Sequence, residues 1–202
     1  MNHARLLTVL VVLVGFASAA SPSFAGEPSD QLKAQLERVI KATQDPEAKK
    51  GGRAAERRAV RKIAEETFDF GDTAKRALAR HWAQRSAAER EEFVQLFTDV
   101  FEHAYLSKVD VLQGDRVAYL GDSVDGDLAT VKTRLTTKQG SQLDVEYRMH
   151  RGASGRWLVY DVLIENVSLV DNYRTQFNSV IQRSSYQELV RKLKAIQAQL
   201  QS

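Results

Sequence analysis

Hydrophobic residues recur at helical spacing in the first half of the chain. The earliest stripe follows two candidate helix caps, Ser29 and Asp30, and consists of four aliphatic residues: Leu32, Leu36, Val39 and Ile40. We expect this helix to end near Asp45-Pro46, because proline cannot continue a helix. A short helix capped by Asp72 is expected next, and Ser86-x-x-Glu89 matches a capping box that begins another helix.

The widest apolar stripe lies over residues 90–105. Its members alternate steps of three and one residues and include four aromatic rings: Phe93, Leu96, Phe97, Val100, Phe101, Ala104 and Tyr105. On the same pattern five polar residues face elsewhere: Glu91, Glu92, Gln95, Asp99 and Glu102. Such a stripe is usually protein core, and its width also allows it to line a cavity.

From about residue 115 the hydrophobic spacing changes to two. The new spacing predicts four strands, at residues 116–120, 128–137, 142–150 and 156–164, joined by glycine-containing turns. The two middle strands alternate cleanly between apolar and polar residues, which indicates one buried and one polar face. The last strand is apolar on both faces, as expected for a strand that is covered on both sides.

Two further helices are predicted after the strands. Ser168 caps the first, and Ser185-x-x-Glu188 is a capping box for the second. The buried stripe of the first is Leu169, Tyr173, Phe177, Val180 and Ile181. The order of elements therefore predicts an α+β fold. We expect an NTF2-like architecture, in which helices pack on a curved four-stranded antiparallel sheet and enclose an apolar cavity.

The chain begins with a short apolar block that differs from the rest. Leu6 to Ala17 are twelve residues without a charge, preceded by Arg5 and followed by small residues. A membrane span needs about 20 apolar residues, so a signal peptide is a better interpretation than a retained anchor. Cleavage after Ala19 or Ala25 fits, and we favour Ala25. Residues 1–25 are thus a predicted signal peptide for export to a bacterial periplasm, and residues 26–202 one domain.

Composition excludes several kinds of site. The chain has no cysteine, which rules out disulfides, cysteine-ligated metals and a lipidated cysteine anchor. Its net charge is +3, or +2 once Arg5 is removed with the signal peptide, and this small excess argues against nucleic acid as a partner in that compartment. The positive charge is concentrated in residues 49–62. This stretch is either a solvated helix face or a surface for anionic lipid headgroups or an acidic partner protein.

No catalytic or metal site is apparent in the sequence. His81, His103 and His150 lie on separate predicted elements, and no nucleophile elbow, phosphate loop or dinucleotide motif is present. The one acid that is a candidate for catalysis is Asp161, which lies in the apolar last strand. It is either a general base for an NTF2-like enzyme, acting with Tyr160 or a histidine, or a carboxylate bonded to a neighbouring helix start. We expect the second, and hence no enzyme.

Several segments of the chain resemble the MlaC family, also called the toluene-tolerance family. They are Phe68–Phe70, Ala77–Trp82, Glu92–Phe97 and, most specifically, Gly155–Val162 followed by Val167–Phe177. The resemblance covers about residues 30–197. One departure is Asn166, which stands where many members have glycine; asparagine tolerates a left-handed backbone better than most residues.

The resemblance implies a periplasmic phospholipid-binding component of the Mla ABC transport system. Such a carrier would be a monomer without a cofactor, would hold phospholipid as cargo, and would move it between an outer-membrane lipoprotein–porin complex and the inner-membrane transporter complex. A second alternative to the lipid carrier, besides the NTF2-like enzyme, is a protein of the cell envelope that binds other proteins through residues 49–62. The residues expected to line the lipid cavity are Trp82, Phe93, Phe97, Phe101, Tyr105, Val131, Leu135, Val145, Tyr147, Trp157, Val159, Ile164, Tyr173, Phe177 and Ile181.

Overall fold

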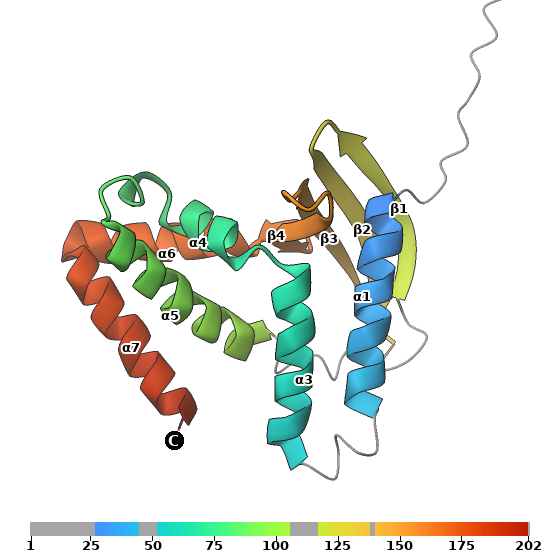
Figure 1. The fold of residues 1–202 in the computed structure, drawn as a ribbon, viewed down its shortest axis with the longest axis horizontal. Coiled ribbons are helices and arrows are strands. Elements are labelled where there is room, and N and C mark those ends of the chain that lie inside the picture. Colours follow the sequence, from blue (N-terminus) through green and yellow to red (C-terminus); the bar gives the residue numbers. More distant parts are fainter. Residues whose placement is uncertain (1–26, 45–51, 106–116, 138–139, 202) are drawn as a thin grey trace, which may run out of the picture.

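The computed structural model describes residues 27–44, 52–105, 117–137 and 140–201 (Figure 1). Its helices are α1 (Glu27–Gln44), α3 (Gly52–Thr67), α4 (Phe70–Leu78), the 3-10 turn η1 (Ala79–His81), α5 (Ala87–Tyr105), α6 (Leu169–Arg183) and α7 (Tyr186–Gln201). Its strands are β1 (Val117–Asp125), β2 (Leu128–Thr136), β3 (Gln142–Arg151), β4 (Trp157–Ile164) and β5 (Val167–Ser168). The predicted α+β class is confirmed, whereas the predicted signal peptide lies outside the described residues.

The strands form one antiparallel sheet in the order β1-β2-β3-β4-β5. The described sheet therefore has five strands, and the expectation of four was too low by the two-residue β5, which is too short to show any alternation. The turn before β5 places Glu165 at φ 50° and Asn166 at φ 64°, so asparagine does occupy the left-handed backbone expected of it.

Strand β1 is longer than its hydrophobic pattern predicts. It runs to Asp125 rather than to Leu120, and its register with β2 shifts between Tyr119 and Gly121. An irregularity of this kind inserts one extra residue and reverses the side-chain alternation beyond it. The alternation of apolar and polar residues therefore stops at Leu120, although the strand continues to its turn at Gly126.

Three of the expected helix caps are correct and two are not. The backbone N–H of Glu89 donates to Ser86 Oγ at 3.2 Å, and Ser168 and Ser185 cap the two last helices in the same way. Helix α1, however, begins at Glu27, before Ser29 and Asp30. Helix α4 begins at Phe70 and is capped by Asp69, whose Oδ1 accepts the N–H of Asp72 at 2.8 Å.

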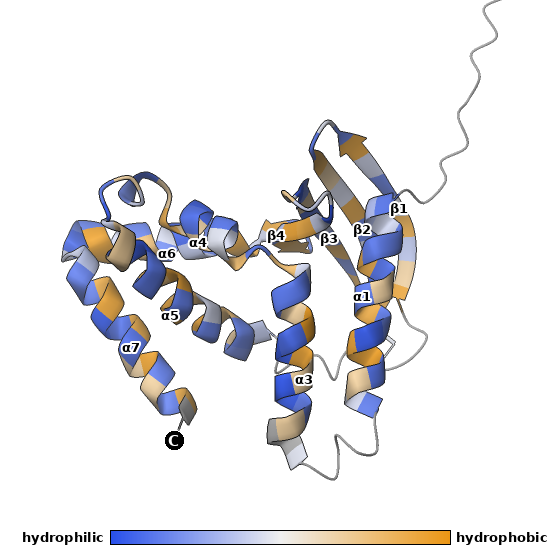
Figure 2. Ribbon diagram, in the orientation of Figure 1, coloured by the Kyte–Doolittle hydropathy of each residue, from blue (hydrophilic) through white to orange (hydrophobic). Residues whose placement is uncertain are grey.

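The core is arranged around β4 and α5. Helices α4 and α6 lie against β4, α7 packs on α5, and α1 lies along β1 and β2 (Figure 1). Hydrophobic residues dominate β4 and interrupt the hydrophilic surface of α5 and α7 at regular intervals (Figure 2). Strand β4 is buried along most of its length, as predicted, because helices cover it and because Asp69 N–H donates to Val159 O at 2.9 Å on its open edge.

A smaller apolar cluster joins the two N-terminal helices. Val60 and Ile63 of α3 are buried against Val39 of α1. This contact gives the charged stretch at residues 49–62 one buried apolar residue, Val60, with Ile63 shortly after it. Lys49 and Lys50 lie outside the described residues, while Arg57, Arg58 and Lys62 are exposed on α3.

Candidate functional site

All fifteen residues expected to line a lipid cavity belong to one hydrophobic cluster or pack against it. Nine of them are buried: Phe93, Phe97, Phe101, Val131, Val145, Tyr147, Trp157, Val159 and Phe177. Six are half-buried at its margin: Trp82, Tyr105, Leu135, Ile164, Tyr173 and Ile181. The structure thus brings the set together, while its role in lining a lipid cavity stays a prediction.

The helical side of this cluster is an aromatic wall, formed by Phe93, Phe97, Phe101 and Tyr105 of α5 with Tyr173 and Phe177 of α6. The ring of Phe97 lies 5.1 Å from that of Tyr173 and 5.7 Å from that of Phe177, in edge-to-face contacts. Such contacts are favourable beyond the apolar area that they bury. The wall is continuous along α5, because Phe93, Phe97 and Phe101 follow one another at ring distances of 6.0 and 5.8 Å.

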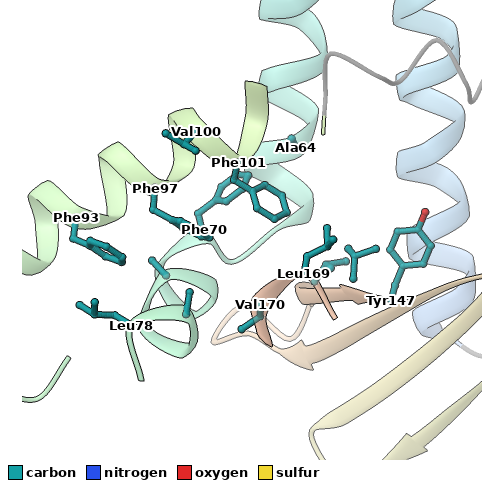
Figure 3. Packing of buried hydrophobic residues seen from close by; sticks show 14 of the residues in the cluster. Ala64, Phe70, Leu78, Phe93, Phe97, Val100, Phe101, Tyr147, Leu169 and Val170 are labelled. Carbon is teal, nitrogen blue, oxygen red and sulfur yellow. The ribbon is translucent and has the colours of Figure 1, made fainter. Parts of the chain in front are cut away.

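Two further rings extend the aromatic wall toward the sheet. Phe68 and Phe70 stack at 5.4 Å, and each lies 6.0 Å from the ring of Phe101 (Figure 3 shows Phe70 beside Phe101). Neither residue was expected to line the site. Phe68 and Phe70 lie at the junction between α3 and α4, so they belong to no periodic apolar stripe that would predict their burial. Their place in the segment Phe68–Phe70, which resembles the family, was the available signal.

The sheet side of the cluster combines aliphatic side chains with the aromatic Tyr147 and Trp157. On the face of β2 and β3 that meets the helices, Val131 pairs with Tyr147 and Thr133 with Val145. Burial raises the pKa of the Tyr147 phenol above its ordinary value, so its hydroxyl keeps its proton. Met149, which was not among the expected residues, is also fully buried here at 1% exposure.

Both tryptophans carry an arginine on one ring face. The Arg151 guanidinium lies 4.4 Å from the Trp157 ring centroid, and that of Arg90 lies 5.4 Å from the Trp82 centroid. Trp157 is also fixed through its backbone, whose N–H donates to Gln31 Oε1 of α1 at 3.0 Å. A charged group on the ring gives each tryptophan one polar side, although Trp82 lies half-buried at the margin of the apolar cluster and Trp157 lies within it at 3% exposure.

Asp161 holds the start of α6. Its Oδ2 accepts the Ser168 hydroxyl at 2.7 Å, and its Oδ1 accepts the Val170 N–H at 3.1 Å. Arg148 lies 3.6 Å from the same carboxylate, while the ring of Tyr160, the partner suggested for it in an enzyme, lies 3.9 Å under the Arg76 guanidinium. Both carboxylate oxygens are therefore engaged in structural bonds, as expected for an acid bonded to a helix start.

The histidines take part in pairwise contacts. His81 Nε2 lies 3.0 Å from Asn178 Oδ1, and His150 Nε2 lies 3.0 Å from Asp69 Oδ2. Within the described ranges, no group of three or more potential side-chain ligands could hold a metal ion. None of the helices in those ranges is long and apolar enough to cross a membrane.

Glu102 corrects the expected polar face of α5. Its side chain is 8% exposed rather than solvated, because Arg61 of α3 covers it, with Nε 3.2 Å from Glu102 Oε2. Glu102 Oε1 has no hydrogen-bond partner among the described residues. Burial raises the pKa of the Glu102 carboxyl to about 7, against the opposing charge of Arg61 and with help from Glu65 and Asp99.

This raised pKa predicts a pH dependence of stability. Because the folded pKa of about 7 exceeds the ordinary 4.5, folding favours the protonated carboxyl. The resulting stabilisation is present below pH 4.5 and is lost as the pH rises through 7. We expect Glu102→Gln to flatten the fall in melting temperature across this window. Glu91→Gln, on the exposed face of the same helix, is the control; an unchanged slope in Glu102→Gln would contradict the placement of this side chain.

Comparisons with known proteins agree with this fold. A phospholipid-binding protein from Ralstonia solanacearum, solved in complex with a phospholipid, superimposes with a TM-score of 0.76 at 24% identity, covering 88% of this chain and 100% of that one. No curated protein sequence matches. The family model described as MlaC protein matches residues 33–195, which is most of the chain and includes every residue of the aromatic wall. The chain therefore belongs to the MlaC family.

Proposed function

We propose that this protein is a periplasmic phospholipid carrier that shuttles lipid between an outer-membrane lipoprotein–porin complex and the inner-membrane Mla ABC transporter. The family match over residues 33–195 carries this proposal. The phospholipid bound to the Ralstonia protein of the same fold supports it. The apolar block at Leu6–Ala17 supports export to the periplasm.

A phospholipid needs such a carrier because its acyl chains cannot cross water unaided. Burial of a methylene group is worth ~0.8 kcal/mol, so two sixteen-carbon chains with about thirty methylenes cost on the order of 24 kcal/mol to expose. A carrier must cover these chains with apolar side chains while its outer surface stays polar. The free energy of moving the lipid between the carrier and a bilayer is then close to zero, since both environments are apolar.

The aromatic wall and the facing sheet provide the apolar cover. Phe97 and Val131 are 0% exposed on the two sides of one cluster, and Tyr173 lies at its half-buried margin. Acyl chains that enter between the helical side and the sheet side replace contacts between rings with contacts to methylene groups. Little apolar surface of the protein therefore becomes exposed to water. No proton transfer or nucleophile is required for this task, in keeping with the structural bonds of Asp161.

Solvent extraction of the natively purified protein tests the proposal. The mature chain, purified without detergent and extracted with organic solvent, is expected to yield phospholipid, because water cannot displace two acyl chains from an apolar site. Lipid is identified by mass spectrometry. A chain that is empty as purified, and remains empty after incubation with phospholipid vesicles, contradicts a carrier function.

A further inference from the structure

Helices α3 and α5 meet through a cluster of charged side chains centred on Arg61. Its Nη2 lies 3.1 Å from Asp99 Oδ1 and its Nε lies 3.2 Å from Glu102 Oε2, both on α5. The same Nε lies 3.1 Å from Glu65 Oε1, one turn along α3. One guanidinium thus bridges three carboxylates that come from two helices. Asp99 also accepts a hydrogen bond from Gln197, which brings α7 to the same cluster.

This charged cluster lies beside the aromatic wall, on the same helix α5. Glu102 directly follows Phe101, and Phe101 belongs to the same apolar cluster as Ala64, three residues after Arg61 (Figure 3 shows Ala64 and Phe101). At its far end α3 leads into Phe68, which pairs with Val159 of β4. Arg61 therefore connects the helix that is fixed to the sheet with the helix that carries most of the aromatic rings.

The cluster is asymmetric in its exposure to water. The Arg61 side chain is 48% exposed, whereas that of Glu102 is 8% exposed. Arg61 is therefore already partly solvated, and its departure leaves three carboxylates near one another, one of them buried. A buried carboxylate without its cation is strongly unfavourable. It is relieved either by uptake of a proton, which the raised pKa of Glu102 favours, or by separation of the two helices and entry of water.

We propose that Arg61 is an electrostatic latch that holds α3 on α5, and that its release opens the aromatic wall for acyl chains to enter and leave. The proposal rests on the carrier function proposed above. It predicts that loss of the latch changes the rate of lipid exchange and does not change the apolar side chains that line the site.

The test is the rate of lipid exchange with vesicles. Pyrene-labelled phosphatidylethanolamine in phosphatidylglycerol vesicles is the probe, and Arg61→Gln is expected to speed its uptake and release by about tenfold or more, equivalent to ~1.4 kcal/mol in the opening equilibrium. Adding Glu102→Gln to Arg61→Gln removes the unpaired buried charge and should restore a rate near that of the wild type. The control is Arg191→Gln, which breaks an exposed ion pair within α7.

A second measurement follows the two helices without lipid. Since the chain has no cysteine, spin labels can be placed at Arg58→Cys on α3 and Gln95→Cys on α5, both exposed positions. Arg61→Gln should shift the distance distribution to longer values, and the double variant should reverse the shift. If Arg61→Gln proves too unstable, Arg61→Lys, which lacks the planar fork of arginine, should give a smaller shift in the same direction.

The outcomes separate the two proposals. Wild-type protein that takes up no lipid contradicts the carrier function, whatever the labels report. Wild-type protein that exchanges lipid at the rate of Arg61→Gln, together with unchanged label distances, overturns the latch and leaves the carrier function standing.

Discussion

Phe97→Ala is expected to lower the free energy of unfolding by about 3–5 kcal/mol, the range for removing a buried aromatic ring. Phe97 is 0% exposed, and its ring contacts Phe93, Phe101, Tyr173 and Phe177 at centroid distances from 5.1 to 6.0 Å. The cavity left by the substitution has apolar neighbours on all of these sides, and they cannot close it without disrupting other contacts. Urea denaturation followed by circular dichroism measures the change.

Leu120→Ala is the matched control for this prediction. Leu120 is also a large apolar residue, but it is 53% exposed on β1, so its loss should change stability by less than about 0.5 kcal/mol. A change in Phe97→Ala no larger than that in the control would show that the aromatic wall is loosely packed. The wall would then not be the centre of the core described above.

Asp161→Ala is the second substitution expected to have a large effect, about 2–5 kcal/mol of stability, because it removes the acceptor of two buried donors. The Ser168 hydroxyl and the Val170 N–H lose their partner, and the start of α6 loses its anchor to β4. The same helix carries Tyr173 and Phe177, so the aromatic wall is weakened indirectly. Thermal and urea denaturation report the loss.

The Asp161 variants also separate a carrier from an enzyme. Asp161→Asn keeps the shape of the side chain, and we expect its folded fraction to exchange lipid at the wild-type rate. Asp171→Ala, an exposed acid in the first turn of the same helix, is the control for stability. Loss of a chemical turnover in Asp161→Asn, with stability unchanged, would favour the NTF2-like enzyme instead.

Much of the site could be predicted because it rests on periodic spacing. The stripe of Phe93, Phe97 and Phe101 is visible in the sequence, since a helix places such residues on one face whatever they pack against. The alternation around Val131 and Val145 is visible for the same reason in a strand. Ser86, Ser168 and Ser185 could be identified as caps because each precedes an apolar stripe.

The features that sequence reasoning missed depend on distant partners. Glu102 is polar and lies among other acids, so only the approach of Arg61 from another helix explains its burial. Asp69 caps α4 because its N–H is already held by Val159 of the sheet, which fixes the chain direction before Phe70. The spacing of residues along one segment contains no information on such contacts. Without them, the sequence does not show which of the two acids near the helix start, Asp69 or Asp72, is the cap.

The intact mass of the natively purified mature chain tests the central claim most directly. If the protein is a phospholipid carrier, its mass under non-denaturing conditions should exceed that of the polypeptide by the mass of a phospholipid, and the excess should vanish after solvent extraction. A mass equal to that of the polypeptide alone, both as purified and after incubation with phospholipid vesicles, would contradict the carrier function.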